Sequence, residues 1–492
     1  MRFLLLIAGI ILFAGTASAA VPLEQIPSPT YPTVTLRVQW NVGSMDDPAG
    51  KEGLAYLMAE SMIEGGTRDL TYREVQDRLF PMAASIRVLV DKETSTFIGE
   101  VHRDHLKDFY KIFKALITEP RLDPKDIDRV KQQIMAYIEK SLRSADDEQL
   151  GKEVLSSTLY KGHPYGHLTM GNLTDLATIT ADDIRSFHDT AFTRNNVTLG
   201  IAGGYPSSFI TTFSRDFSRL PDTRMDRSPL PDPPALEGRH VVLVQKETSG
   251  AAISIGFPIS ITRGHQDFIP LMVANSYLGE HRTFNGVLMN HMRGDRGLNY
   301  GDYSYIEYFD QDGGTTFSLP NIARRQQFFS IWIRPVDPRN ALFSIRQSLF
   351  ETDRLIREGI SEEEFEAARK FVRNYSKLWV QSLSRRLGYL MDSRFYGTGD
   401  FIREIDTRLE TLTRDEVNDA IRTYLQTENL VIAVVAKDAE TMKTLLEKEI
   451  ASPIMYQTEG TKCDLLKEDK VIESYPLNVT SVTITPVDTL FQ

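Results

Sequence analysis

Histidine and cysteine are the side chains that most often bind metal ions or act as nucleophiles, and this chain of 492 residues has nine histidines and one cysteine. His102 and His105 are three residues apart and, together with Asp104, have a spacing that can serve a metal site. They lie, however, at the polar start of an amphipathic helix, a position that favours surface histidines over ligands. With Cys463 as the single cysteine, no intramolecular disulfide can form. These residues predict neither a metal centre nor a cysteine–histidine nucleophile.

A second group of candidate residues lies in the stretch 42–55, which combines glycines, acidic residues and small apolar residues and is followed by Gly65-Gly66-Thr67. The stretch resembles the segment that leads into the zinc helix of the insulinase/pitrilysin-type metallopeptidases, and Gly65-Gly66-Thr67 resembles the end of that helix. The resemblance extends to residues 293–300 and to residues 155–171, whose histidines it implies are structural loop residues. Because the matching segments span both halves of the chain, together they are more specific than any one of them.

The resemblance implies a zinc site whose ligands this chain lacks. Catalytic members carry His-x-x-Glu-His, in which two imidazoles and a distant Glu hold zinc and the Glu of the motif takes a proton from water. Here Tyr56 stands at the first ligand position, Ala59 at the general-base position and Glu60 at the second ligand position. A phenol with a reference pKa of about 10 is a poor ligand at neutral pH, and alanine cannot accept a proton. The stretch expected to supply the distant Glu, residues 130–134, offers Gln and Lys, so we expect no metal and no other cofactor in this chain.

The part of the family's site that this chain keeps lies in its second half. Catalytic members pair an Arg with a later Tyr, and the resemblance implies that both contact the scissile peptide. Arg293 and Tyr300, seven residues apart, match that pair by type and spacing. A tyrosine hydroxyl can donate to a developing oxyanion, and a guanidinium group can hold substrate carbonyls. The alternative is that Arg293 caps a helix and Tyr300 begins a strand with an ordinary aromatic face.

The elements that position these residues are repeated along the chain. Residues 176–204 align without gaps with residues 409–437. Thr180 and Thr413 occupy equivalent positions, and each is followed three residues later by a carboxylate, which is the pattern of a helix-start capping pair. In both copies an alternating strand follows the helix. The repeat therefore favours duplication and two homologous domains.

The proline-rich, charged segment 220–236 is predicted to link the two domains. It separates an insulinase-like N-terminal domain with the degenerate zinc site, residues 20–219, from a C-terminal domain with the Arg and Tyr, residues 237–451. Residues 452–492 form a tail with no predicted role. Strands precede helices in each half, so the expected fold class is α+β, with two homologous domains of the processing-peptidase/insulinase type, each a mostly antiparallel sheet packed with helices.

Two details of the sheets also follow from the sequence. Residues 315–319 are expected to form a strand of the second sheet. The first sheet is expected to be one strand short, because residues 21–31 are rich in proline and make a poor central strand.

Residues 1–19 are predicted to be a signal peptide, with Arg2, a short apolar run and Ala17-Ser18-Ala19 as the cleavage signal. The protein is therefore expected to be exported, with the periplasm as its natural location. A net charge of −11 excludes the basic field that nucleic acid or an anionic membrane requires. No later stretch reaches about 18 uninterrupted apolar residues, so stable membrane insertion is not expected.

Together these features predict an exported subunit that binds no metal and contributes peptide-binding and oxyanion-side residues to a zinc-bearing, insulinase-type partner in a hetero-oligomer. Zinc is expected only in that partner. The alternative is a catalytically inert peptide-binding or scaffold protein with the same fold.

Overall fold

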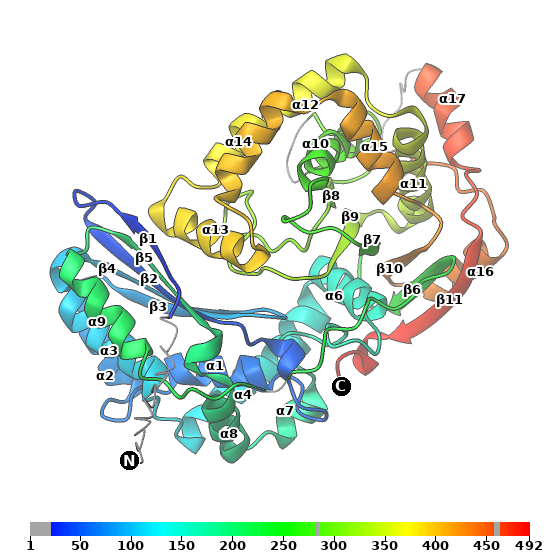
Figure 1. Ribbon diagram of the computed structural model, residues 1–492. Coiled ribbons are helices and arrows are strands. Elements are labelled where there is room, and N and C mark those ends of the chain that lie inside the picture. Colours follow the sequence, from blue (N-terminus) through cyan, green and yellow to red (C-terminus); the bar gives the residue numbers. More distant parts are fainter. Residues whose placement is uncertain (1–20, 226, 281–284, 457–462) are drawn as a thin grey trace, which may run out of the picture.

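The structure is a computed structural model that describes residues 21–225, 227–280, 285–456 and 463–492. The predicted signal peptide, residues 1–19, lies outside the described residues. The described chain forms two halves, each built on one β-sheet with helices packed against it (Figure 1). The prediction of an α+β fold with two homologous domains is confirmed.

Five strands form the sheet of the first half, in the order β1-β5-β2-β4-β3. β1 pairs with β5 in parallel, and the other neighbours are antiparallel. The expectation that this sheet lacks a strand is wrong, because part of the proline-rich segment forms β1 at the sheet edge, where Pro27 does not interrupt a central ladder. The strands are β1 (Leu23–Pro27), β2 (Thr33–Trp40), β3 (Ser85–Val90), β4 (Ser95–His102) and β5 (Val197–Gly203).

The helices of the first half begin where the sequence supplies capping residues. At the predicted start of α8, Asp183 N donates to Thr180 Oγ1 (3.2 Å) and Thr180 N donates to Asp183 Oδ2 (2.8 Å), which confirms the capping pair. The α-helices are α1 (Leu54–Glu64), α2 (Tyr72–Leu79), α3 (Leu106–Thr118), α4 (Pro124–Ala136), α5 (Arg143–Ala145), α6 (Asp147–Leu159), α7 (Leu173–Thr178), α8 (Ala181–Ala191) and α9 (Ser207–Phe217).

The sheet of the second half repeats the topology of the first and adds one strand. Its order is β11-β6-β10-β7-β9-β8, and the parallel pair β6–β10 corresponds to β1–β5. The additional strand, β11, comes from the tail and pairs in parallel with β6, so the tail completes this sheet. The strands are β6 (Arg239–Gln245), β7 (Ala251–Ile259), β8 (Asp302–Tyr305), β9 (Gln327–Val336), β10 (Leu430–Ala436) and β11 (Val479–Pro486).

The prediction of a strand at residues 315–319 is wrong. Only an isolated bridge between Gln311 and Ser318 forms there. The turn around Gly313 and Gly314 is held by the donation from Asp312 N to Phe317 O (3.0 Å), which directs this segment away from the ladder of β8 and β9.

Helices on the second sheet follow the same order as those of the first half. At the start of α15, Glu416 N donates to Thr413 Oγ1 (3.3 Å), as in the equivalent cap of α8. None of the helices in the described part of the chain is long and apolar enough to cross a membrane. The α-helices are α10 (Phe268–Leu278), α11 (Ala341–Glu358), α12 (Glu362–Leu378), α13 (Leu383–Tyr396), α14 (Phe401–Thr411), α15 (Arg414–Tyr424), α16 (Ala439–Glu447) and α17 (Cys463–Ile472).

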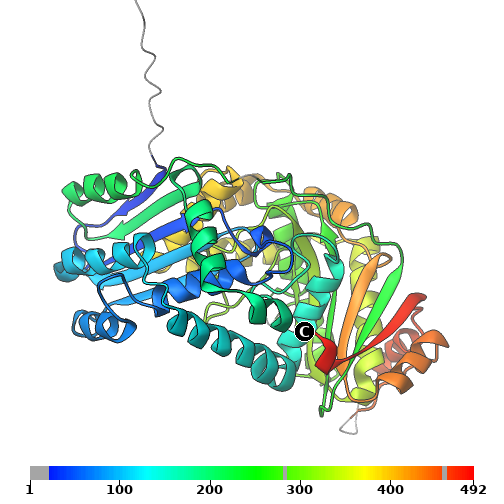
Figure 2. The same cartoon turned by 90° about the horizontal axis from the view of Figure 1, so that it is seen from below.

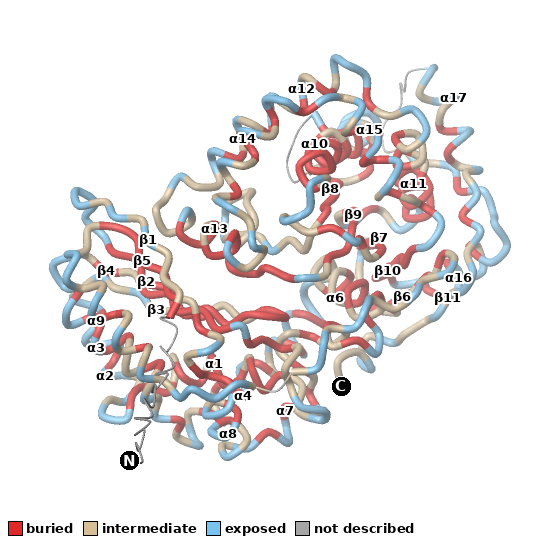
Figure 3. The backbone as a smooth tube through the Cα atoms, viewed as in Figure 1, coloured by how far each residue is buried: buried red, intermediate tan, exposed pale blue. Residues whose placement is uncertain are grey.

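Each half places one helix on the sheet of the other half. Helix α6 from the first half packs against β7 and β10, whereas α13 from the second half packs against β5 and β1 (Figure 1, Figure 2). The buried core of the first half consequently continues into Val431, Ala433 and Val435 of β10. Figure 3 shows the buried backbone running along the strands of both sheets and through the region where the halves meet. The core of the first half therefore extends onto the second sheet, while the second half also has a large core of its own.

Two ion pairs, the first of them buried, add to this contact. The Asp91 carboxylate accepts two hydrogen bonds of 2.6 Å from Arg324, and both side chains are almost fully buried. Glu93 accepts a 2.5 Å hydrogen bond from Arg325 Nε. Each pair joins the loop between β3 and β4 to the segment before β9, so the halves are fixed in one relative orientation.

Candidate functional site

Helix α1 carries the three residues that occupy the predicted zinc-motif positions, and its start is fixed by the acidic residues before it. Asp47 accepts hydrogen bonds from Gly53 N (2.7 Å) and Ala55 N (2.8 Å), which satisfies free amides of the first turn. Gly53 has φ of 93°, and a Cβ there would lie 2.5 Å from Met170 O. His167 Nε2 lies 3.4 Å from the Asp47 carboxylate. The glycines and acids of this stretch thus shape the helix start.

The side chains at the motif positions lie in a desolvated environment. Ala59 is fully buried and presents only a methyl group. Burial and the neighbouring Glu64 raise the pKa of Glu60 to about 7. Burial also raises the pKa of Tyr56, and the negative charge of Glu60 adds to the effect. The phenol of Tyr56 is therefore neutral at neutral pH, and Glu60 is the one residue of the three that offers a group able to bind zinc.

Two neighbours of Tyr56 were not expected from the sequence. Tyr137 and Asp310 both contribute to the raised pKa of the Tyr56 phenol, and Asp310 comes from the second half. The pKa of Asp310 is itself raised to about 6 by burial and by the charges of Asp91 and Glu153. A carboxyl group from the second half therefore raises the pKa of a residue on α1. The two residues are more than two hundred positions apart in the sequence, so no local pattern predicts this effect.

Residues 130–134, the stretch predicted to stand at the distant ligand position, do not provide an acid in the structure either. Lys131 is buried in α4, and its Nζ donates to Ile179 O (2.6 Å). In the described part of the chain, no group of three or more His, Cys, Asp or Glu side chains is arranged to hold a metal ion. His102, which the sequence brings together with His105 and Asp104, accepts from Asp104 N through its Nδ1 at 3.4 Å and so serves as a local cap.

Arg293 and Tyr300 lie together at the surface of the second half. The guanidinium carbon of Arg293 is 4.7 Å from the centroid of the Tyr300 ring, a cation–π contact. Tyr300 is 72% exposed. Because β8 begins at Asp302, Tyr300 precedes the strand, and it is separate from the buried cluster formed by Tyr303 and Tyr305. Arg293 is half-buried, so Tyr300 is the member of the pair that is open to a ligand from solvent.

Asn299 and Asp302, which the sequence analysis did not single out, fix the turn that carries Tyr300. Asn299 Nδ2 donates to Asp302 Oδ1 (2.6 Å) and to Arg334 O (3.0 Å), and Gly301 N donates to Asn299 Oδ1 (3.1 Å). Asp302 is fully buried, and burial raises its pKa to about 8, an effect that the positive charge of Arg293 partly opposes. Its Oδ2 has no hydrogen-bond partner among the described residues. A neutral, buried acid next to Arg293 is thus part of this site.

The structure brings Arg293 together with Tyr300, and Tyr56 together with Glu60. The first pair lies just before β8 in the second half, and the second pair lies on α1 in the first half.

The two sheets of like topology, the glycine-shaped start of α1 and the Arg293–Tyr300 contact define a two-domain α+β protein. Two family profiles match the chain: "Insulinase (Peptidase family M16)" over residues 24–172 and "Peptidase M16 inactive domain" over residues 178–372. Together they cover more than half of the chain, the first lying within the first half and the second running from α8 of the first half to α12 of the second. The chain belongs to peptidase family M16, the insulinase family.

Proteins of similar sequence include zinc proteases and a processing peptidase. YmxG of Bacillus subtilis, described as an uncharacterised zinc protease, is 22% identical over 411 residues, covering 83% of this chain and 94% of that protein. The beta subunit of the mitochondrial-processing peptidase of Caenorhabditis elegans is 21% identical over 272 residues, covering 52% of this chain and 55% of that protein.

Solved structures show the same fold. The peptidase M16 inactive domain from Pseudomonas fluorescens superposes with a TM-score of 0.73 at 19% identity, covering 84% of this chain and 94% of that chain. A chain of complex III2 from Candida albicans superposes with a TM-score of 0.67 at 13% identity, covering 85% of this chain and 94% of that chain. At these identities the likeness concerns the fold alone.

Proposed function

We propose that this protein is a subunit of an M16 peptidase that binds no zinc itself and acts with a zinc-bearing homologue. In this complex it binds the peptide substrate through Arg293 and Tyr300. The observation that carries the proposal is the contact between the half-buried Arg293 and the exposed Tyr300, in a molecule whose helix α1 offers Tyr56, Ala59 and Glu60.

The chemistry of the motif positions supports the absence of zinc. A structural or catalytic zinc ion needs three or four protein ligands, and the helix provides one carboxyl group, whose pKa of about 7 reflects its desolvation. Ala59 cannot take a proton from a bound water, and loss of a general base typically costs about 10² to 10⁴ in rate. Any hydrolysis therefore depends on a metal site in another chain.

Arg293 and Tyr300 retain what a substrate-binding subunit needs. The guanidinium group presents several donors in a fixed plane and can hold peptide carbonyl oxygens. The Tyr300 hydroxyl, held beside Arg293 by the ring contact, can donate to the oxygen that becomes negatively charged during peptide hydrolysis. Asn299 and Asp302 set the position of that ring and act as positioning residues.

The proposal also includes a zinc-bearing partner and a periplasmic location. A homologue with an intact zinc motif supplies the metal, and the similarity to a peptidase named as the beta subunit of an assembly supports a hetero-oligomer. The N-terminal segment with Arg2 and Ala17-Ser18-Ala19 supports export, with the periplasm as the destination.

The proposal is tested by purifying the protein alone and together with an M16 homologue that has the intact motif. Zinc is quantified by mass spectrometry, and cleavage is followed with unstructured peptides. For the chain alone, we expect no stoichiometric zinc and no peptide cleavage. For the complex, we expect stoichiometric zinc and peptide cleavage. Arg293→Ala is expected to lower turnover of the complex by about 10² or more without changing its zinc content.

The control is Arg339→Ala, which removes an exposed arginine of the same half that pairs with Asp337. It should leave turnover unchanged. Full activity of the Arg293→Ala complex contradicts the substrate role of Arg293. A complex that forms but never cleaves peptides would favour the inert scaffold, and tightly bound zinc in the isolated chain would contradict the proposal as a whole.

A further inference from the structure

Arg293 lies in a short π-helix, Met289–Gly294. Turns of this kind are rare in proteins and frequently occur at functional sites. The direction of the Arg293 side chain depends on what holds this turn in place. The contacts that hold it are made by two neighbours of Arg293, His291 within the turn and Arg296 just after it.

Arg296 connects the π-helix to the tail of the chain. Its side chain is fully buried. It donates from Nε to Asp469 Oδ1 (2.8 Å) and from Nη2 to Glu468 Oε2 (2.7 Å), and both acceptors lie on α17. Its Nη1 donates to the backbone oxygen of His291 (3.0 Å), inside the π-helix. One guanidinium group therefore joins the turn that carries Arg293 to the tail helix.

Helix α11 closes this connection into a ring of charged groups. Glu468 also accepts from Arg354 Nη1 (3.1 Å) on α11, the helix that lies beside α17 (Figure 1). Arg354 pairs in turn with Glu351, a fully buried side chain one turn earlier on the same helix. The Glu351 carboxylate lies 2.7 Å from Nδ1 of His291. The π-helix is thus held at His291 by α11, and Arg296 holds it to α17.

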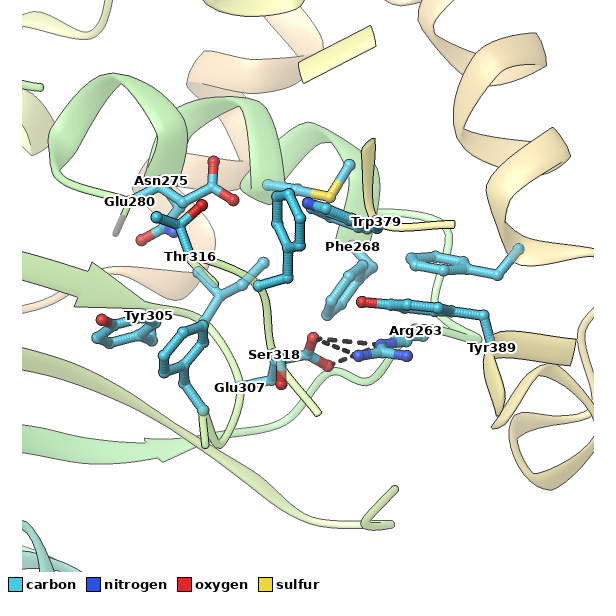
Figure 4. A pocket seen from close by; sticks show the side chains of 15 residues that line it. Arg263, Phe268, Asn275, Glu280, Tyr305, Glu307, Thr316, Ser318, Trp379 and Tyr389 are labelled. Carbon is cyan, nitrogen blue, oxygen red and sulfur yellow. Dashed lines mark hydrogen bonds and ion pairs between the residues drawn. The ribbon is translucent and has the colours of Figure 1, made fainter. Parts of the chain in front are cut away.

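A second buried arginine of this half shows what distinguishes Arg296. Arg263 donates from Nε to Glu307 Oε2 (3.0 Å) and from Nη2 to Glu307 Oε1 (2.8 Å) at one wall of a pocket (Figure 4). Both of these residues belong to the domain predicted at residues 237–451. The two carboxylates that pair with Arg296 come instead from the tail. A positive charge buried in the second domain is therefore compensated by a helix from outside that domain.

Tyr300 is anchored in a different way. Asn299 ties the turn of Tyr300 to Asp302 and to the backbone oxygen of Arg334 on β9, so these contacts lie at the second sheet. Loss of the contact with the tail is therefore expected to displace Arg293 more than Tyr300. The two members of the proposed substrate-binding pair depend on different parts of the chain.

We propose that the tail helix α17 positions Arg293 for peptide binding, with Arg296, Glu468 and Asp469 as positioning residues. The ion pairs of Arg296 hold the π-helix, and the Arg293 guanidinium stays beside the Tyr300 ring. Without the two carboxylates, the charge of Arg296 is buried without its partners, and the turn shifts until water reaches it. This inference rests on the proposed role of Arg293, but the hold of α17 on the π-helix can be measured without any peptide.

The first test measures hydrogen–deuterium exchange of the full-length protein by mass spectrometry. In the double variant Glu468→Gln/Asp469→Asn, the backbone amides of residues 289–297 are expected to exchange at least about tenfold faster than in the wild type. The matched control is Asp464→Asn, an acid-to-amide change on the same helix at a side chain that is 95% exposed. It should exchange like the wild type. Unchanged exchange in the double variant overturns the proposal.

The second test measures kcat/KM for peptide cleavage by the complex with the zinc-bearing homologue. The double variant is expected to lower kcat/KM about tenfold when Arg293 is present. In the Arg293→Ala background it should lower kcat/KM by less than about twofold, because it acts through Arg293. A general loss of folded protein would lower both values equally. Equal losses in the two backgrounds therefore overturn the positioning role.

These outcomes separate this inference from the proposed function. If Arg293→Ala lowers kcat/KM and the double variant does not, the substrate role of Arg293 stands and the role of α17 is wrong. If Arg293→Ala changes nothing, the substrate role is wrong, and the exchange of residues 289–297 still decides whether α17 holds the π-helix. If circular dichroism shows that the double variant is unfolded, Glu468→Gln alone replaces it, because Asp469 then still pairs with Arg296. Exchange and kcat/KM should then change in the same directions, by about threefold.

Discussion

Asp302 shows how one buried side chain links the proposed site to the stability of the fold. Burial raises its pKa to about 8, whereas an aspartate in an unfolded chain has a pKa of about 3.9. Between these values the folded chain holds a proton that the unfolded chain has released. The contribution of Asp302 to stability is therefore fully present below about pH 4 and is lost as the pH rises towards 8.

We expect Asp302→Asn to remove this pH dependence. The amide oxygen still accepts from Asn299, but no proton is bound or released. Relative to the wild type, the variant should gain free energy of unfolding between pH 5 and pH 8 by up to about 1.4 kcal/mol per pH unit. Urea denaturation at both pH values measures the difference. Asp295→Asn, at an exposed neighbouring position, should show no such trend, and a constant difference for Asp302→Asn would contradict its buried protonation.

At the scale of elements, the start of α1 depends more on Gly53 than on Gly50. Gly50 and Gly53 both have positive φ, 75° and 93°. A Cβ at Gly50 would meet nothing within 4 Å, whereas a Cβ at Gly53 would lie 2.5 Å from the backbone oxygen of Met170. The helix start therefore fits against the loop before α7 only without a side chain at position 53.

Gly53→Ala is accordingly expected to lower the free energy of unfolding by about 2 kcal/mol or more, because backbone strain and a collision act together. Gly50→Ala should cost only about 1 kcal/mol, the strain of the left-handed conformation alone. Chemical denaturation of the two variants gives the comparison. Equal losses would mean that the contact with Met170 relaxes freely.

At the scale of the whole molecule, the halves are joined by apolar contact and by buried charge. Asp91→Ala leaves the Arg324 guanidinium buried without its carboxylate, and loss of one partner from a buried pair typically costs about 3–5 kcal/mol. The free energy of unfolding, measured by denaturant titration, should fall by about 3–5 kcal/mol. Glu247→Ala, which removes an exposed partner of Lys437, should change nothing measurable. A small loss for Asp91→Ala would show that water reaches Arg324.

The sequence alone predicts the features that depend on neighbouring residues. Capping at Thr180 and Thr413 and the duplicated fold follow from local patterns, and the Arg293–Tyr300 contact is consistent with their spacing. The edge strand β1 was missed because its proline argues against a central strand but not against an edge. The influence of Asp310 on Tyr56 depends on how the halves pack, which no periodicity encodes. Asp302 was missed because an aspartate that starts a strand gives no sign of being fully buried.

The position of β11 sets an order of events during synthesis. β11 covers the outer edge of β6, yet its residues 479–486 are made after those of every other strand. Until the ribosome has produced them, the backbone groups of β6 on that side face solvent and are open to pairing with another nascent chain. The first sheet has all its strands once residue 203 has emerged, whereas β6 keeps an unpaired edge until the last of the described strands has been made.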